Sequence, residues 1–246
     1  MLIKRLLQSW MRATTRKALA ASPVAAAIPE PERLAGFNWL VKGRHGTFVA
    51  SDNDIYIGRA LIHYGEFSEI EWALLERYCR TGDTVVEVGA NIGAHTVSLS
   101  KAVGPEGRIV AIEPQPLIFQ TLCANLALNC LLNVETWNVA CGSGAGVLSV
   151  PALDYEAENN FGAVSLVAHK GTPRSITVPV RPLDELLRDH ARVDLVKIDV
   201  EGMERAVLEG AQAVITKFRP ILYIENDRVP KSQALIEMLG EMGYRM

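Results

Sequence analysis

The sequence is poor in cysteine and nearly balanced in charge. Its four cysteines form no Cys-x-x-Cys pair and have no histidine neighbour at zinc-ligand spacing, so neither a disulfide framework nor a zinc site is predicted. The net charge of -3 provides no basic field that would attract a nucleic-acid backbone. We therefore expect buried thiols in a reducing, cytoplasmic setting, no nucleic-acid partner, and a small molecule or a neutral glycan as ligand.

Long hydrophobic runs are also missing. No apolar stretch approaches the ~20 residues that cross a bilayer, and Arg12, Arg16 and Lys17 interrupt the N-terminal stretch before it reaches the length of a signal-peptide core. Neither a transmembrane segment nor export is predicted. The basic, amphipathic character of residues 2–19 predicts a surface helix, and residues 20–31, with several Ala and Pro, predict a linker.

Strand-like and helix-like segments alternate after Thr81. Of the 246 residues, 49% are apolar, which is enough for one large domain with a substantial core. Short apolar runs predict strands at residues 84–88, 108–112, 134–139, 194–198 and 221–224, with segments of helical period between them. This alternation predicts an α/β fold of the Rossmann-like kind, with a mainly parallel sheet and helices on both faces.

The chain divides into three predicted parts. Residues 1–35 form an extension, residues 36–80 a cap region with a small hairpin at 48–57 and a helix at 70–79, and residues 81–246 the main domain. Two β-prone pieces at 147–150 and 175–180 predict an inserted hairpin or lid within residues 142–180. Farther on, Gly210 is expected to bend or end a helix over residues 203–214.

The turn after the first strand of the main domain carries the main functional signal. It reads Glu87-Val88-Gly89-Ala90-Asn91-Ile92-Gly93 and leads into a helix. Ligands bind at the carboxyl ends of parallel strands. Gly89 and Gly93 permit close backbone approach to a ligand, and the helix start offers free N–H donors. The turn therefore predicts a nucleotide-like ligand.

The kind of nucleotide depends on Asn91. Dinucleotide-binding oxidoreductases, the main alternative, need glycine at that position so that the backbone can reach a pyrophosphate. A side chain there obstructs a diphosphate but suits S-adenosylmethionine, and Glu87 suits an α-amino group or a sulfonium. The residues thus favour the methyl donor over NAD. A non-catalytic binding protein on the same scaffold is a further alternative.

Other residues at the strand ends extend the predicted donor site. Glu113 ends the second strand, 24 residues after Gly89, where a carboxylate can accept both ribose hydroxyls. The alternative for Glu113 is a solvated acid before a proline-capped helix. Asn138, at the end of the third strand, is placed to reach an adenine edge, with Val139 or Ala140 against the adenine face.

Carboxylates after the fourth and fifth strands predict the acceptor side. Asp199, Glu201 and Glu225 follow these strands, and a carboxylate with a raised pKa can accept the proton of an alcohol during methyl transfer. Asp199 and Glu201 could instead cap the next helix. A Mg²⁺ ion on Asp199, Glu225 and Asn226 is a weaker alternative, because Glu replaces the Asp of catechol-type enzymes, and no metal site is predicted.

His95 lies one helical step from the donor turn, in Gly93-Ala94-His95-Thr96. It could orient the substrate or act as a base, since a histidine titrates near neutral pH. Packing or hydrogen bonding at the helix start is an equally good interpretation. The other four histidines show no ligand spacing and are expected to be structural or exposed.

Several motifs together, in this order, resemble the FkbM family of methyltransferases. They are Tyr64-Gly65-Glu66-Phe67-Ser68-Glu69, the turn from Glu87 to Thr96, Ile112-Glu113-Pro114, Asn160-Phe161-Gly162, and Lys197-Ile198-Asp199-Val200-Glu201-Gly202. The resemblance covers roughly residues 36–246. It implies S-adenosylmethionine-dependent O-methylation of a hydroxyl on a sugar, a glycan or a polyketide-type natural product.

The resemblance also implies residue roles and shows two departures. Tyr64 and Glu66 would line the methionine end of the donor, unless they only form a capping turn before the next helix. Glu87 stands where many relatives have Asp, a change that keeps the charge. Class I methyltransferases usually finish with an antiparallel edge hairpin. Here the chain ends at Met246, where a sixth strand is expected, so the sequence lacks that hairpin or is truncated, and an uncovered edge strand would be a liability.

Overall fold

The computed structural model describes residues 29–162 and 174–245. The predicted helix over residues 2–19 and most of the predicted linker lie outside the described residues. No helix within the described part is long and apolar enough to cross a membrane.

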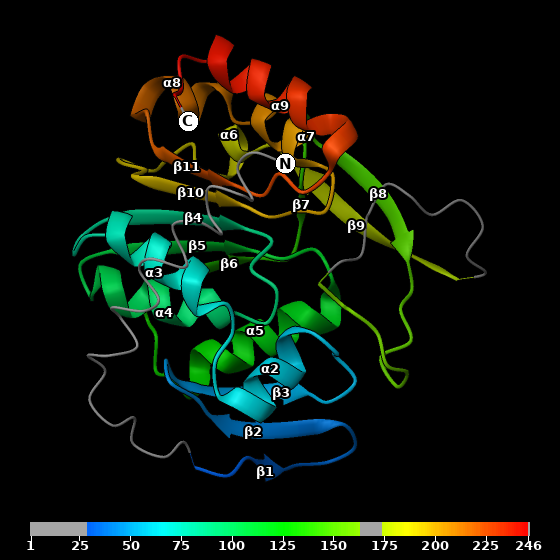
Figure 1. Ribbon diagram of the computed structural model, residues 1–246. Helices are drawn as coiled ribbons and strands as arrows, with labels where there is room; N and C mark the ends of the chain where they lie inside the picture. Colours follow the sequence, from blue (N-terminus) through cyan, green and yellow to red (C-terminus); the bar gives the residue numbers. More distant parts are fainter. Residues whose placement is uncertain (1–28, 163–173, 246) are drawn as a thin grey trace.

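The centre of the molecule is a five-stranded sheet whose strands are all parallel (Figure 1). Its order is β11-β10-β4-β5-β6. The strands are β4 (Thr84–Val88), β5 (Arg108–Ile112), β6 (Val134–Trp137), β10 (Leu195–Ile198) and β11 (Ile221–Ile224). The chain proceeds outward from β4 to β6 on one side and from β10 to β11 on the other. The strand order thus reverses between β4 and β10, which is where ligands bind in such sheets.

Helices cover both faces of this sheet, as Figure 1 shows. On one face lie α3 (Glu69–Tyr78), α4 (Ala94–Val103) and α5 (Pro116–Leu128), and on the other α6 (Leu183–Leu186), α7 (Glu204–Glu209), α8 (Gln212–Phe218) and α9 (Val229–Glu241). Successive strand residues point to opposite faces. Accordingly, Val85 and Ile109 belong to one buried apolar cluster, and Val86 and Val110 to a second. The predicted Rossmann-like α/β fold is confirmed.

The predicted core strands agree closely with those observed. The bounds of β4, β5 and β11 coincide with the prediction. The third strand was predicted to run to Val139 but ends at Trp137, because Asn138 turns its amide back to donate hydrogen bonds to the carbonyl oxygens of Glu113 and Pro114. The predicted break at Gly210 is confirmed: α7 ends there, and a Cβ on Gly210 would lie 2.0 Å from the carbonyl oxygen of Gly142.

The cap region contains a small antiparallel sheet made of β1 (Glu32–Arg33), β2 (Asn38–Lys42) and β3 (Thr47–Ser51), followed by α2 (Ile57–Tyr64). The predicted hairpin over residues 48–57 is wrong, since β3 pairs with the preceding β2 rather than with a later strand. Asp54 is the physical reason: its carboxylate accepts hydrogen bonds from the backbone N–H groups of Tyr56 and Gly58 and so starts α2.

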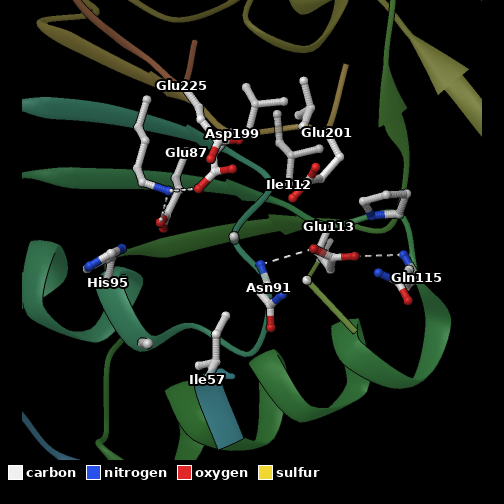
Figure 2. Close-up of a pocket in the computed structure, with 18 of the residues that line it drawn as sticks. Ile57, Glu87, Asn91, His95, Ile112, Glu113, Gln115, Asp199, Glu201 and Glu225 are labelled. Carbon is white, nitrogen blue, oxygen red and sulfur yellow. Dashed lines mark hydrogen bonds and ion pairs between the residues drawn. The ribbon is translucent and has the colours of Figure 1, made fainter. Parts of the chain in front are cut away.

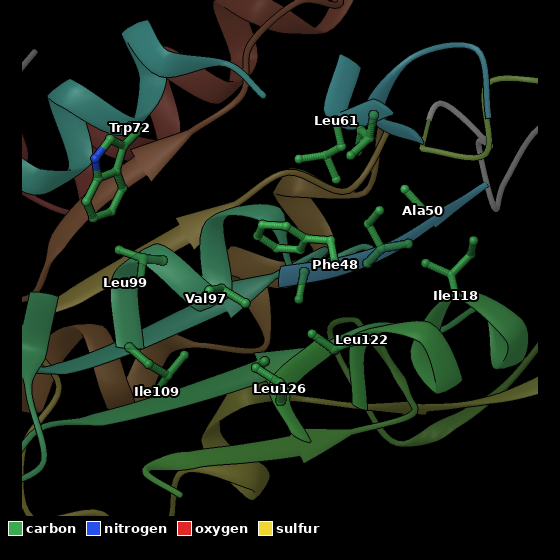
Figure 3. Close-up of a cluster of buried hydrophobic side chains, with 14 of the residues drawn as sticks. Phe48, Ala50, Leu61, Trp72, Val97, Leu99, Ile109, Ile118, Leu122 and Leu126 are labelled. Atoms are coloured by element: carbon green, nitrogen blue, oxygen red, sulfur yellow. The ribbon is translucent and has the colours of Figure 1, made fainter. Parts of the chain in front are cut away.

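Two asparagines of α5 attach this small sheet to the main domain. Asn125 accepts a hydrogen bond from the backbone N–H of Val49 and donates one to its carbonyl oxygen, and Asn129 does the same with Thr47. The two side chains thereby satisfy the free edge of β3 as a neighbouring strand would. The apolar side of β3 packs with α4 and α5 in the first cluster, where Phe48 lies near Leu122 and Leu126 (Figure 3).

The segment between β6 and β10 forms a second small sheet in the order β7-β9-β8. Its strands are β7 (Ala140–Cys141), β8 (Gly146–Pro151) and β9 (Ser175–Arg181), so the two β-prone pieces become β8 and β9. Residues 152–162 then cross to the cap region, where Asn159 forms a bridge with Asp54. Phe161 is buried there against Tyr155. The insertion therefore reaches the helix that follows β3.

Candidate active site

A cavity of about 290 Å³ opens at the carboxyl ends of β4, β5 and β10, at the reversal of the strand order. Figure 2 shows the residues around it. The donor turn forms one wall, and Val139 and Ala140 contribute an apolar stretch. Residues of the cap region, among them Tyr56, Ile57 and Phe67, close the cavity from the other side. The site therefore combines the main domain with the cap region.

The donor turn is bent into a conformation that suits its glycines. Gly89 and Gly93 have φ of 87° and 86°, and Asn91 has φ of 51°. A Cβ on Gly89 would lie 1.9 Å from the carbonyl oxygen of Asp199, so only glycine permits this close approach of β4 to the end of β10. Ala90 and Asn91 line the cavity, whereas Gly93 packs beneath it against Leu122.

Glu113 is bound directly to this turn. One carboxylate oxygen accepts a hydrogen bond from the N–H of Asn91 at 3.0 Å, and the other accepts one from the N–H of Gln115 at 2.9 Å (Figure 2). Burial raises the pKa of Glu113 to about 7, although the two backbone hydrogen bonds lower it. With 3% of its surface exposed, Glu113 is not the solvated acid of the alternative interpretation. Each oxygen keeps a further lone pair for a ligand hydroxyl.

Glu87 lies deeper than predicted. It is 1% exposed, and its carboxylate accepts a hydrogen bond from Thr96 Oγ1 at 2.6 Å. Burial raises the pKa of Glu87 to about 7, against the opposing effects of Lys197 and Thr96. Thr96 does not line the cavity and acts through Glu87. Asn138 likewise stands behind the site, where it holds the backbone after Glu113.

Lys197 is a site residue to which the sequence analysis assigned no role. It is 2% exposed, and its ammonium nitrogen lies 3.1 Å from Asp199 Oδ2 and 3.7 Å from both Glu87 Oε1 and Glu71 Oε1. Burial alone would lower the pKa of Lys197, but these three carboxylates raise it overall. Lys197 therefore stays charged. The available signal was a lysine inside the otherwise apolar strand Leu195–Ile198.

The three predicted acceptor-side carboxylates lie together at the cavity, in different electrostatic states. Burial favours the neutral form of Asp199, but Lys197 lowers the pKa of Asp199 overall. Glu225 shares a hydrogen bond with Asp199, and burial together with that negative charge raises the pKa of Glu225 to about 8. Near neutral pH, Asp199 is therefore ionised while Glu225 carries the proton. Figure 2 shows their side chains next to each other.

Glu201 is held by an ion pair. Arg228 Nη2 donates to Glu201 Oε2 at 2.5 Å, and burial raises the pKa of the Glu201 carboxyl in opposition to this pair. The alternative in which Asp199 or Glu201 caps the next helix is wrong, because no side chain makes a capping hydrogen bond at the start of α7, which follows Met203.

The carboxylates of Glu201, Glu225 and Asp227 bring oxygen atoms within 4.8 Å of one another. Arg228 already neutralises Glu201, and the amide of Asn226 donates to Ser232 Oγ. Asp199, which we considered as a Mg²⁺ ligand together with Glu225 and Asn226, does not belong to this group.

His95 lies at the cavity with 6% of its surface exposed. Burial, with a contribution from Lys197, lowers the pKa of His95 to about 3, so the ring is neutral. Such a ring is a weak base near neutral pH but a good hydrogen-bond acceptor.

The two residues implied at the methionine end do not line the cavity. Tyr64 is 70% exposed, and Glu66 pairs with Arg44 at 2.5 Å. Their neighbours Phe67, Ser68 and Glu71 lie there instead.

Comparison with known proteins gives one family match. Residues 87–246 match the model of the methyltransferase FkbM domain. Among curated proteins, methyltransferase sdnD of Sordaria araneosa is 30% identical over 154 residues, which cover 51% of this chain and 59% of that protein. Methyltransferase 1 of Beauveria bassiana is 28% identical over 145 residues, 51% of this chain and 57% of that protein. The chain thus spans less than two thirds of these relatives.

Solved structures are similar at a lower level. An FkbM methyltransferase from Methylobacillus flagellatus is 19% identical with a TM-score of 0.47, covering 78% of this chain and 48% of that one. Fibrillarin from Aeropyrum pernix, solved with natively bound S-adenosyl-L-methionine, is 15% identical with a TM-score of 0.45, covering 89% of this chain and 91% of that one.

Proposed function

The chain belongs to the FkbM methyltransferase family, and from this we propose that it transfers the methyl group of S-adenosylmethionine to a hydroxyl group of a sugar, a glycan or a natural product. The observation that carries the proposal is the ionised carboxylate of Asp199, held beside Lys197 at a cavity formed by the donor turn. The acceptor class is the part of the proposal that needs an experiment.

The residues of the cavity fit the donor. The cavity carries more negative charge than Lys197 balances, because Asp199 is ionised and Glu87 and Glu113, with pKa values of about 7, are partly ionised near neutral pH. Such a field favours a sulfonium cation and disfavours a diphosphate. Asn91 adds to this preference, since its side chain occupies space next to Gly162 where a diphosphate would need an open backbone. S-adenosylmethionine, when bound, supplies an electrophilic methyl group on its sulfonium.

Glu113 is suited to the ribose of the donor. Its two oxygens are oriented by the N–H groups of Asn91 and Gln115, and each can accept one more hydrogen bond. Val139 and Ala140 provide an apolar surface for the adenine. In this arrangement Gly89 and Asp199 would border the sulfonium of the bound donor.

The acceptor side supports a hydroxyl substrate. A hydroxyl must lose its proton as it is methylated, and Asp199 is the carboxylate that remains ionised near neutral pH. Glu225, which holds a proton, and Glu201 offer further hydrogen-bonding groups at the same rim. Because the rim is acidic, we expect neutral acceptors to be preferred over phosphorylated or carboxylated ones.

Tritium transfer from methyl-labelled donor to a panel of neutral glycans and hydroxylated natural products tests the proposal. We expect label in at least one hydroxyl acceptor, and Asp199→Asn should reduce turnover by about 100-fold or more while donor affinity changes little. The control is Asp227→Asn, which removes an exposed carboxylate nearby and should retain turnover. Label found only in amine or thiol acceptors would contradict O-methylation. Equal loss of turnover and donor affinity would make Asp199 a donor ligand instead.

A further inference from the structure

One buried nitrogen at the cavity has no hydrogen-bond partner. His95 Nε2 is buried and unpartnered among the described residues, although the ring lines the cavity. The ring also has a backbone hydrogen bond with Ser68. Since Nε2 is unpartnered, that bond belongs to Nδ1, and Nε2 of the neutral ring is an acceptor. A buried acceptor without a donor is costly unless a ligand supplies one.

A second acceptor lies opposite this nitrogen. Oε2 of Glu71, on α3, is 3.9 Å from His95 Nε2, which is too long for a hydrogen bond. The hydroxyl of Tyr223 donates to Glu71, and Lys197 lies 3.7 Å from its other carboxylate oxygen. Glu71 is thus held in place from two sides, facing an acceptor that has no proton to share. Glu71 lies before residues 87–246, the segment that matches the family model.

The charges at this end of the cavity do not balance. Glu71, Asp199 and the partly ionised Glu87 surround the ammonium group of Lys197, and His95 is neutral. A positively charged group with several N–H donors would reduce this imbalance and satisfy both acceptors. An ammonium group carries three donors, enough to bridge Glu71 and His95.

The place of this pair along the cavity indicates which ammonium it receives. His95 and Glu113 lie on opposite sides of the cavity in Figure 2, with Glu87 and Asp199 between them. With the ribose at Glu113 and the sulfonium near Asp199, the amino-acid end of the donor extends toward His95. We propose that Glu71 and His95 bind the α-ammonium group of the methyl donor, an inference that rests on the proposed function.

Two ligands that differ at this group test the inference by isothermal titration of the full chain. S-adenosylhomocysteine carries the α-ammonium, and 5′-methylthioadenosine has the same adenosine and thioether without the amino acid. Glu71→Gln should weaken S-adenosylhomocysteine binding by about tenfold or more, as for loss of a charged hydrogen bond, and leave 5′-methylthioadenosine within about twofold. Glu76→Gln, exposed on the same helix, should leave both affinities unchanged.

His95→Phe tests the same inference from a different helix, α4. It should weaken the binding of S-adenosylhomocysteine and leave that of 5′-methylthioadenosine nearly unchanged. If Glu71→Gln does not fold, this variant decides the question alone. Equal weakening of the two ligands, or no weakening of either, would overturn the inference while leaving the proposed function standing. Failure of the unmodified protein to bind either ligand would overturn the proposed function, and this inference with it.

Discussion

The ammonium nitrogen of Lys197 lies 3.1 Å from Oδ2 of Asp199, two residues farther along the chain at the end of β10. This contact determines which carboxylate of the acceptor side is ionised. Beside the lysine, Asp199 keeps its negative charge, and Glu225, hydrogen-bonded to Asp199, retains a proton. A buried lysine at the cavity thus determines the charge state of the candidate base.

Lys197→Met should destabilise the protein strongly. The substitution keeps much of the side-chain volume but leaves Glu87, Glu71 and Asp199 without their shared cation. Removal of one partner from a buried ion pair costs about 3–5 kcal/mol, so we expect the free energy of unfolding to fall by that amount. Urea denaturation at pH 7 measures it.

The matched control for this variant is Lys42→Met, on the exposed side of β2. It should change the free energy of unfolding by less than about 0.5 kcal/mol. Equal changes in the free energy of unfolding would show that the ion pairs of Lys197 do not stabilise the fold.

The stability of the ligand-free protein should fall as pH rises from 5 to 8. The carboxyls of Glu87 and Glu113 have pKa values raised by burial to about 7, above the value of 4.5 expected in the unfolded chain. Between these values the folded state binds more protons, so their contribution is complete below pH 4.5 and lost as pH rises through 7. Each group contributes a slope of at most about 1.4 kcal/mol per pH unit.

Urea denaturation at several pH values measures this slope. The lowered pKa of Asp199 acts in the opposite direction below pH 4, outside this window. The pKa of His95, lowered from 6.5 to about 3, also opposes the decline, but only up to about pH 6.5, where one histidine offsets one of the carboxyls with a raised pKa. Glu113→Gln should make the decline shallower, because one of the three carboxyls whose raised pKa values lie near this window, those of Glu87, Glu113 and Glu225, is gone. A stability that rises with pH between 5 and 8 would contradict the assigned states of these buried acids.

Gly89→Ala should abolish donor binding, whereas Gly82→Ala should not. Both glycines have positive φ, 87° and 85°, so alanine strains the backbone at either position by roughly 1–2 kcal/mol. Only at Gly89 does the new Cβ meet an atom, the carbonyl oxygen of Asp199, while the space around Gly82 is open. Donor affinity by titration and Tm by calorimetry separate the two effects. Normal donor affinity in Gly89→Ala would contradict the proposed close approach.

Asn125→Ala and Asn129→Ala should both destabilise the protein, but only Asn125→Ala should weaken donor binding. Both residues hydrogen-bond the edge of β3, so each substitution leaves backbone groups unpaired at a cost of about 1–3 kcal/mol. Asn125 alone also donates to the carbonyl oxygen of Ile92 in the donor turn, at 2.8 Å. We therefore expect weaker donor binding only in Asn125→Ala. The same donor affinity in both variants would show that this contact does not position the turn.

The sheet could be predicted from the sequence because its strands are short apolar runs buried on both faces. Every residue of β4 and β10 is buried, and turns or charged residues delimit each run. The cap region was harder, since the pairing of β3 depends on the earlier strand β2 and on two asparagines some 80 residues away. No local pattern contains that information.

The sequence indicated which acidic residues form the site but not which of them are ionised. The donor turn, Glu113, Asp199 and Glu225 were identified from their places after strands, and the three carboxylates line one cavity together with the turn as far as Asn91. Their pKa values depend on burial and on Lys197, and the Glu71 that faces His95 comes from a helix outside the family match. These features arise from contacts between distant segments, which spacing along the chain cannot reveal.

The central claim is that the turn from Glu87 to Gly93, with Glu113, holds S-adenosylmethionine rather than a dinucleotide. Isothermal titration of the intact protein with S-adenosylhomocysteine and with NAD tests it most directly. The account predicts binding of S-adenosylhomocysteine at one site per chain, strong weakening by Glu113→Gln, and no binding of NAD. Measurable NAD binding without binding of S-adenosylhomocysteine would contradict it.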